Sequence, residues 1–198
     1  MTRRKSLLRD KLHETTRNVI VDALVAQLLD SGAYDLTYFA LARRSGVSVR
    51  TIYRHFPTRA DLLDELARRV NAVMNLKEYP RSREATTSLV RTLHATWDHN
   101  APVVSAQIQA GLGGKLRTKG RQKRVNVVHE VLSATLPGLT ADRRRAAAGV
   151  IQVLLSSNTW ARLRDEIGLD GQQSGDVTAW AIDTLWRALE AEDRKSRS

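Results

Sequence analysis

The stretch "SGVSVRTIYRHFPTRADLL", residues 45–63, holds the strongest structural signals of the chain. Gly46 can adopt the positive φ that ends a helix, and Ser48 can cap the next helix two residues later. Pro57 ends that helix, because the residue before a proline avoids the helical conformation, and Thr58 can cap another. Two short helices joined by a tight turn predict a helix-turn-helix.

The pattern on either side of this stretch is also helical. Apolar residues recur every three to four positions from Leu7 to Leu29, and "YFALARRS" (38–45) follows Thr37 as a short helix. No period-two alternation is long enough for a strand. Further helices are predicted at residues 83–98, 102–112, 121–135, 141–167 and 175–192.

We therefore expect an all-α fold of about nine helices. A small N-terminal three-helix domain with the helix-turn-helix precedes a larger helical domain. Residues 1–9 are expected to form a flexible basic arm, and residues 10–72 the helix-turn-helix domain, which includes the start of the fourth helix. Residues 73–198 form the C-terminal domain.

Charge is distributed unevenly along the chain. The 198 residues carry a formal net charge of +11, which suggests an anionic partner. Residues 1–60 hold 11 Lys and Arg against 5 Asp and Glu, whereas the remaining residues hold 21 against 16. The absence of cysteine excludes disulfides and thiolate metal sites, and no apolar run approaches the roughly 20 residues needed to cross a bilayer. We expect a soluble cytoplasmic protein with no membrane partner.

The two short helices separate core residues from outward ones. Their shared core is expected to consist of Leu41, Val47, Ile52 and Phe56. The outward side of the second helix is polar, cationic and about as wide as a major groove; it consists of Ser48, Arg50, Thr51, Arg54 and His55. Val49 fits either the core side or contact with a thymine methyl group. These features predict a helix that reads DNA.

The string "GVSVRTIYRHFPTRADLLDEL" (46–66) resembles the TetR-like family of transcriptional regulators. The glycine, the Tyr-x-His-Phe group and the basic residue that follows stand at that family's spacing, and "GAYDLTYFALARRSG" (32–46) matches in layout. The close resemblance covers residues 10–68. Phe39 and Ala40 depart from the family pattern, which often has a polar or acidic residue there, and Arg50 replaces a residue that is often small.

The resemblance implies a role for each residue of the helix-turn-helix. Thr37 and Tyr38 would start their helix against the DNA backbone, and residues 48–51 would approach base edges. Tyr53, His55 and Arg59 would anchor phosphates. The predicted DNA-binding residues are Thr37, Tyr38, Arg44, Ser48, Val49, Arg50, Thr51, Tyr53, Arg54, His55 and Arg59.

The resemblance also implies a homodimer that binds a pseudo-palindromic DNA operator and releases it when a small-molecule effector binds the C-terminal domain. The predicted ligand-binding residues are His94, Trp97, Gln107 and Asn158. The predicted dimer interface contains Val153, Trp160, Ala181, Leu185 and Ala188, because the helices around them carry more apolar and small residues than one solvent-facing helix needs. The alternative is that these residues belong to the chain's own core.

Two other functions remain open: a DNA architectural protein indifferent to sequence, and a small all-α enzyme that uses His, Asp or Glu. No nucleophile elbow and no set of histidines at metal-ligand spacing is present, so we expect no catalysis, no metal and no cofactor. The segment "GLGGK" (111–115) has the wrong spacing for a phosphate-binding loop. The basic run "RTKGRQKR" (117–124) is expected to be solvated.

Overall fold

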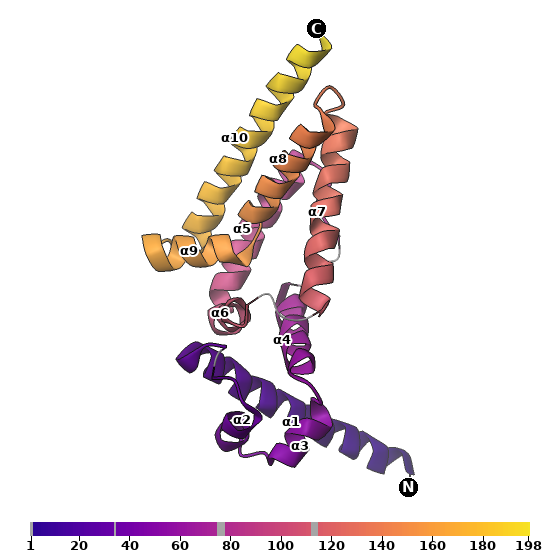
Figure 1. Ribbon diagram of the computed structural model, residues 1–198, viewed down its shortest axis with the longest axis vertical. Coiled ribbons are helices and arrows are strands. Elements are labelled where there is room, and N and C mark those ends of the chain that lie inside the picture. Colours follow the sequence, from indigo (N-terminus) through magenta and orange to yellow (C-terminus); the bar gives the residue numbers. More distant parts are fainter. Residues whose placement is uncertain (1, 34, 75–77, 112–114) are drawn as a thin grey trace. The chain divides into compact units, whose positions relative to one another are not determined.

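The structure is a computed structural model that describes residues 2–33, 35–74, 78–111 and 115–198, with side chains from residue 7 onward except those of residues 115–121. Within these ranges the chain forms ten helices and no strand (Figure 1). The helices are α1 (Thr2–Ser31), α2 (Tyr38–Ser45), α3 (Val49–His55), α4 (Arg59–Met74), α5 (Arg83–His99), α6 (Ala101–Gln109), α7 (Lys115–Thr135), α8 (Ala141–Leu154), α9 (Ser157–Ile167) and α10 (Gly171–Arg197). The all-α prediction is confirmed.

Several helix boundaries differ from the prediction. Helix α7 begins at Lys115 instead of residue 121, and α10 spans Gly171–Arg197 instead of 175–192. Helix α1 begins at Thr2 instead of Leu7, so residues 2–9, expected to be a flexible arm, are helical. The single helix predicted over 141–167 is two helices, which raises the number from nine to ten. The division arises at Ser156, whose side chain accepts a hydrogen bond from the Thr159 N–H at 3.3 Å and so caps α9. The segments at 111–115 and 117–124 lie partly outside the described residues and side chains.

The chain divides into two compact units. The N-terminal unit comprises Met1–Val70 and Pro102–Arg117, and the C-terminal unit comprises Asn71–Ala101 and Thr118–Ser198. Helix α6 therefore joins the N-terminal unit, although the sequence-based division at residue 72 assigned it to the C-terminal domain. Ala106 of α6 is fully buried in the N-terminal core, where its small side chain allows a close approach.

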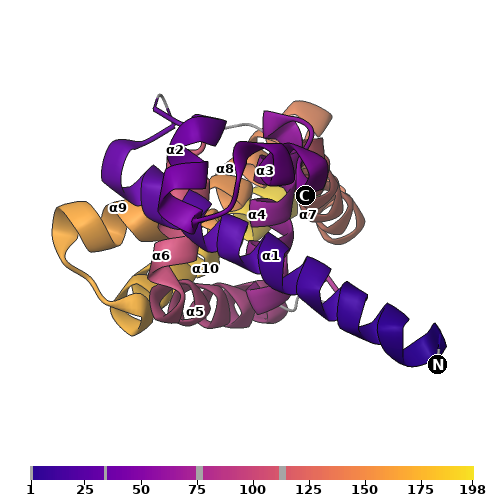
Figure 2. The ribbon, with the colours of Figure 1, turned by 90° about the horizontal axis from the view of Figure 1, so that it is seen from below.

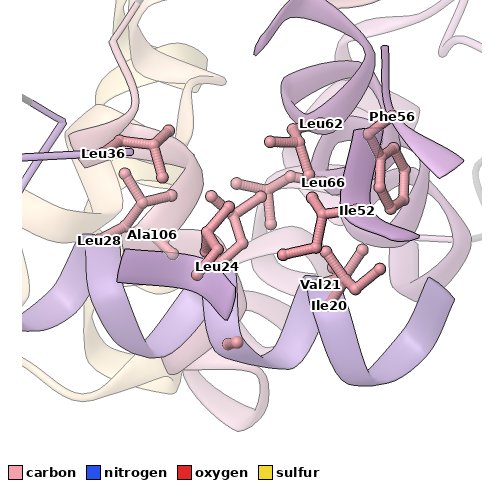
Figure 3. Packing of buried hydrophobic residues seen from close by; sticks show 12 residues of the cluster. Ile20, Val21, Leu24, Leu28, Leu36, Ile52, Phe56, Leu62, Leu66 and Ala106 are labelled. Carbon is pink, nitrogen blue, oxygen red and sulfur yellow. The ribbon is translucent and has the colours of Figure 1, made fainter. Parts of the chain in front are cut away.

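The N-terminal core brings the apolar side of α1 against α3 and α4. Ile20, Val21, Leu24 and Leu28 follow the helical repeat along α1, and Figure 3 shows them pointing toward residues of the other helices. The facing side chains come from Leu36, Ile52, Phe56, Leu62, Leu66 and Ala106. Three of the four predicted core residues, Leu41, Ile52 and Phe56, are at most 1% exposed, which confirms their assignment. Val47 is half-buried and packs against this core.

In the C-terminal unit, α10 runs alongside α5 (Figure 1). Two glycines of α10 allow the close approach. A Cβ atom on Gly171 would lie 2.6 Å from the Asp98 Cβ, and one on Gly175 would lie 3.0 Å from the Arg91 Cα. Asp170 begins α10 with a capping box to Gln173. Helix α10 is thus positioned by a local cap and by a glycine contact with α5.

Candidate nucleic-acid interface

Local hydrogen bonds fix the ends of α2 and α3. The Thr37 side chain accepts a hydrogen bond from the Ala40 N–H at 3.1 Å, and the Ser48 side chain accepts one from the Thr51 N–H at 3.2 Å. Gly46 has φ of 70° and donates its N–H to the Ala42 carbonyl at 3.0 Å. A residue with a Cβ would be strained at this φ. The predicted helix starts and turn are confirmed, and α2 and α3 lie next to each other beside α1 (Figure 2).

A pair of tyrosines joins the start of α2 to α3. The rings of Tyr38 and Tyr53 stack with centroids 4.2 Å apart, and the Tyr38 hydroxyl donates a hydrogen bond to the Phe56 carbonyl at 2.8 Å. Burial raises the pKa of Tyr38, and the nearby Tyr53 and Asp61 raise it further. Tyr38 is half-buried, and its hydroxyl group donates its proton to a hydrogen bond within the domain. Tyr53, in contrast, is 51% exposed.

Arg17 of α1 holds the other end of α3. Its guanidinium donates to the His55 carbonyl at 3.1 Å, lies 4.4 Å from the centroid of the Phe56 ring and pairs with Glu65 of α4. Burial alone would raise the pKa of Glu65, but hydrogen bonds from Arg68 and Arg17 outweigh it and hold this pKa below its ordinary value. Sequence reasoning missed Arg17; its position three residues before Ile20, on the core side of α1, is the signal that could have revealed it.

The outward side of α3 is polar and cationic, as predicted. Ser48, Arg50 and Arg54 are exposed, and Val49 and Thr51 are half-buried. Arg50 and Arg54 stand four residues apart and therefore share one side of the helix. Neither forms an ion pair with a described residue, so both guanidinium groups are available to an anionic partner.

His55 departs from its predicted role. Only 7% of the residue is exposed, and its ring lies 4.2 Å from that of His13 on α1. The pKa of His55 is lowered first by burial and further by His13, Arg54 and Arg17. His55 follows Arg54 directly, so its side chain lies about 100° further round α3. It is on the same side as Ile52 and faces α1, away from the outward side. The expected phosphate contact does not fit this buried ring.

Two other predicted DNA-binding residues, Arg44 and the predicted phosphate anchor Arg59, already bind within the domain. Arg44 forms an ion pair with Asp30 at 2.5 Å, and Arg59 donates to the Ala33 carbonyl at 2.7 Å. Both side chains are exposed, and a guanidinium has five N–H donors, so each keeps donors for a phosphate. Their DNA contacts stay predictions.

The helix-turn-helix also matches known proteins in sequence. The family model described as "Bacterial regulatory proteins, tetR family" matches residues 20–66. The matched residues include the whole helix-turn-helix, α2 and α3. A relative, the HTH-type transcriptional regulator HbdR of Aromatoleum sp. (strain CIB), is 35% identical over 108 residues, which are 54% of this chain. The match spans 46% of the length of that relative.

Solved structures of other proteins share the fold. NalD, the secondary repressor of the MexAB-OprM multidrug efflux pump in Pseudomonas aeruginosa, superposes with a TM-score of 0.66 at 17% identity, over 85% of this chain and 94% of NalD. A tetR-family transcriptional regulator from Streptomyces coelicolor gives 0.59 at 14% identity, over 92% of this chain and 85% of its own. At these identities the likeness concerns the fold of the chain.

Two of the four predicted ligand-binding residues lie together in the C-terminal unit. His94 and Trp97 on α5 are buried side by side, with ring centroids 5.2 Å apart. The His94 Nδ1 lies 3.1 Å from the Ser174 hydroxyl, its buried Nε2 has no hydrogen-bond partner among the described residues, and burial lowers its pKa to about 4. Asn158 is exposed on α9, and Gln107 belongs to the N-terminal unit.

The predicted dimer interface is partly corrected. Trp160 is fully buried, and its indole N–H donates to Asp98 at 3.3 Å, so it is a core residue of the C-terminal unit. Val153 and Ala188 are exposed, and Ala181 and Leu185 are half-buried. Trp180 on α10, which is 66% exposed, and Val150 on α8 were not among the five predicted interface residues, although both lie in the helices predicted to form the interface. Apolar and small residues recur on one side of α10 at positions 177, 180, 181 and 188 and form the stripe of α10. This recurrence is the signal in the sequence that could have revealed it.

Among the described residues, no helix is long and apolar enough to cross a membrane. The described His, Asp and Glu side chains form no group of three suited to hold a metal ion.

Proposed function

We propose that the chain is a homodimeric transcriptional repressor that binds a pseudo-palindromic DNA operator and releases it when a small molecule binds the C-terminal unit. The observation that carries the proposal is the outward side of α3. Arg50 and Arg54 stand there exposed and without ion pairs to described residues, on a helix held by Tyr38 and Arg17, in a TetR-family domain.

Each arginine has a distinct role in this proposal. Arg50 follows the N-cap of α3 by two residues, where a helix entering the major groove meets the base edges. Its guanidinium binds guanine O6 and N7 with two hydrogen bonds, while Arg54, one turn later, binds a phosphate. Tyr53, Arg44 and Arg59 contribute backbone contacts.

A twofold dimer supplies two reading helices. The exposed apolar residues of α8 and α10, among them Val150, Val153 and Trp180, form the interface in this proposal. Two α3 helices one turn of DNA apart, about 34 Å, then read a pseudo-palindrome. Repression is inferred from the likeness to the repressor NalD. The effector lowers the affinity for the operator by an amount set by the difference between its own affinities for the two dimer conformations.

Selection of bound sites from a random duplex library tests the proposal. We expect an enriched pseudo-palindrome whose half-sites are about one helical turn apart, bound at least roughly 10³-fold more tightly than scrambled duplex at one salt concentration. Equal affinity for selected and scrambled duplexes would contradict a repressor and favour an architectural protein.

A further inference from the structure

Phe39 is the most exposed large apolar residue among the described residues, with 75% of its surface accessible. It occupies the second position of α2, directly after Tyr38. No described residue of its own domain covers it, although the neighbouring Leu41 is fully buried. A single exposed apolar residue needs no explanation by itself. Exposed cationic residues, however, lie near Phe39.

The helical phase places Phe39 on a defined side of α2. Side chains advance by about 100° per residue, so Phe39 and Arg43, four positions apart, share one flank. Ala40 and Arg44 lie about 100° further round the helix, and Arg44 pairs with Asp30 at the end of α1. Phe39 and the exposed Arg43 therefore lie on a different flank from that contact.

The residue before Phe39 connects the start of α2 to α3 through the stacked tyrosines. The ring of Tyr38, next to Phe39, lies against Tyr53, which is exposed and stands between Arg50 and Arg54 in the sequence. The Thr37 cap and the Tyr38 hydroxyl bond hold the backbone around Phe39 at both neighbouring residues. Phe39 is thus a preorganised apolar contact beside the proposed reading helix.

The chemistry of the ring selects its contact within DNA. A phenyl ring accepts no strong hydrogen bond and carries no charge, so it gains nothing from a phosphate. The apolar group that a duplex exposes in its major groove is the C5 methyl group of thymine. We infer that Phe39 is a specificity-determining residue that contacts the methyl group of one thymine in each half-site. This inference rests on the proposed function.

The test removes only that methyl group. In the selected operator, each thymine is replaced in turn by deoxyuridine, and affinities are measured for the wild-type protein, Phe39→Ala and Phe39→Leu. We expect one thymine per half-site at which the wild type loses about fourfold in affinity, the value for one buried methyl group. Phe39→Ala should bind the thymine and deoxyuridine operators equally, and Phe39→Leu should keep part of the difference.

Control measurements separate the possible failures. Ile167→Ala removes another exposed apolar side chain, at the end of α9, and should keep the wild-type deoxyuridine profile. Identical deoxyuridine profiles for the wild type and Phe39→Ala would overturn the inference. An equal loss of affinity by Phe39→Ala for selected and random duplexes would also overturn it, because that result indicates a contact with the sugar. A wild-type protein without any sequence preference would overturn the proposed function and this inference with it.

Discussion

The phenol rings of Tyr38 and Tyr53 stack almost in parallel, with centroids 4.2 Å apart and planes at 3° to each other. The hydroxyl of Tyr38 reaches past this stack to the Phe56 carbonyl at the end of α3. A helix of seven residues cannot be stable alone, so contacts with its neighbours determine how α3 is presented. The geometry of the proposed reading helix therefore depends on side chains that do not themselves read bases.

Replacement of Tyr38 by phenylalanine tests this dependence. Tyr38→Phe removes the hydrogen bond to the Phe56 carbonyl and keeps the stacked ring, so we expect a loss of about 1 kcal/mol in the free energy of unfolding. Urea denaturation measures this loss. Tyr53→Phe keeps the stack and serves as the matched control, with an expected change within about 0.5 kcal/mol. Equal free energies of unfolding for the two variants would show that the Tyr38 hydroxyl does not stabilise the fold.

The buried His94 predicts a pH dependence. Its pKa is about 4 in the folded protein against about 6.5 in the unfolded chain, so the unfolded chain binds the proton more tightly between these values. The stability due to neutral His94 is present above about pH 6.5 and is lost as the pH falls toward 4. Between pH 7 and 5 the loss is about 2 kcal/mol.

The His94 contribution is isolated by comparing the wild type with His94→Gln at each pH. Protonation of His55 and of the carboxylates affects both proteins and cancels in the difference of their unfolding free energies. We expect the advantage of the wild type over the variant to shrink by about 2 kcal/mol from pH 7 to 5. A difference that stays constant with pH would contradict the burial of a neutral His94.

The contact between α5 and α10 predicts intolerance of a methyl group at Gly171. A Cβ there would lie 2.6 Å from the Asp98 Cβ and 3.0 Å from the His94 carbonyl oxygen, so the two helices must separate. We expect Gly171→Ala to lower the free energy of unfolding by about 1 to 3 kcal/mol. Gln172→Ala, at the exposed neighbouring position, should change it by less than about 0.5 kcal/mol. Thermal or urea unfolding of both variants provides the comparison.

The proposed dimer interface predicts that a charge on the stripe of α10 yields monomers. Ala188 is exposed and lies on the same side of α10 as Ala181, so Ala188→Glu would bury a carboxylate between two protomers. We expect light scattering at micromolar concentration to give a dimer for the wild type and a monomer for this variant. Gln172→Glu, on the opposite side of α10, should remain dimeric. A monomeric wild type would refute the interface.

Sequence reasoning succeeded where structure is determined locally. The caps at Thr37 and Ser48 and the positive φ of Gly46 involve residues at most four positions apart, so a short string contains all the partners. The resemblance carried by residues 46–66 likewise depends on contiguous spacing. These local features account for most of the helix-turn-helix.

Sequence reasoning failed where the burial of a side chain depends on a residue that is distant in the sequence. His55 is covered by His13, and Trp160 donates to Asp98, and neither neighbour can be identified from helical spacing. The break between α8 and α9 was missed because Ser156 can stand within a helix or cap one, and apolar periodicity continues across it. Clusters of side chains from remote helices, such as His94 with Ser174, require the folded chain.

The central claim is that the exposed side of α3 reads bases, with Arg50 as reader and Arg54 as backbone contact. The most direct test measures the affinity of the wild type, Arg50→Ala and Arg54→Ala for every single-base variant of the selected operator at one salt concentration. We predict that Arg50→Ala abolishes discrimination at one guanine in each half-site, worth about 1 to 3 kcal/mol, while Arg54→Ala weakens all duplexes similarly. An unchanged preference profile in Arg50→Ala would contradict the account.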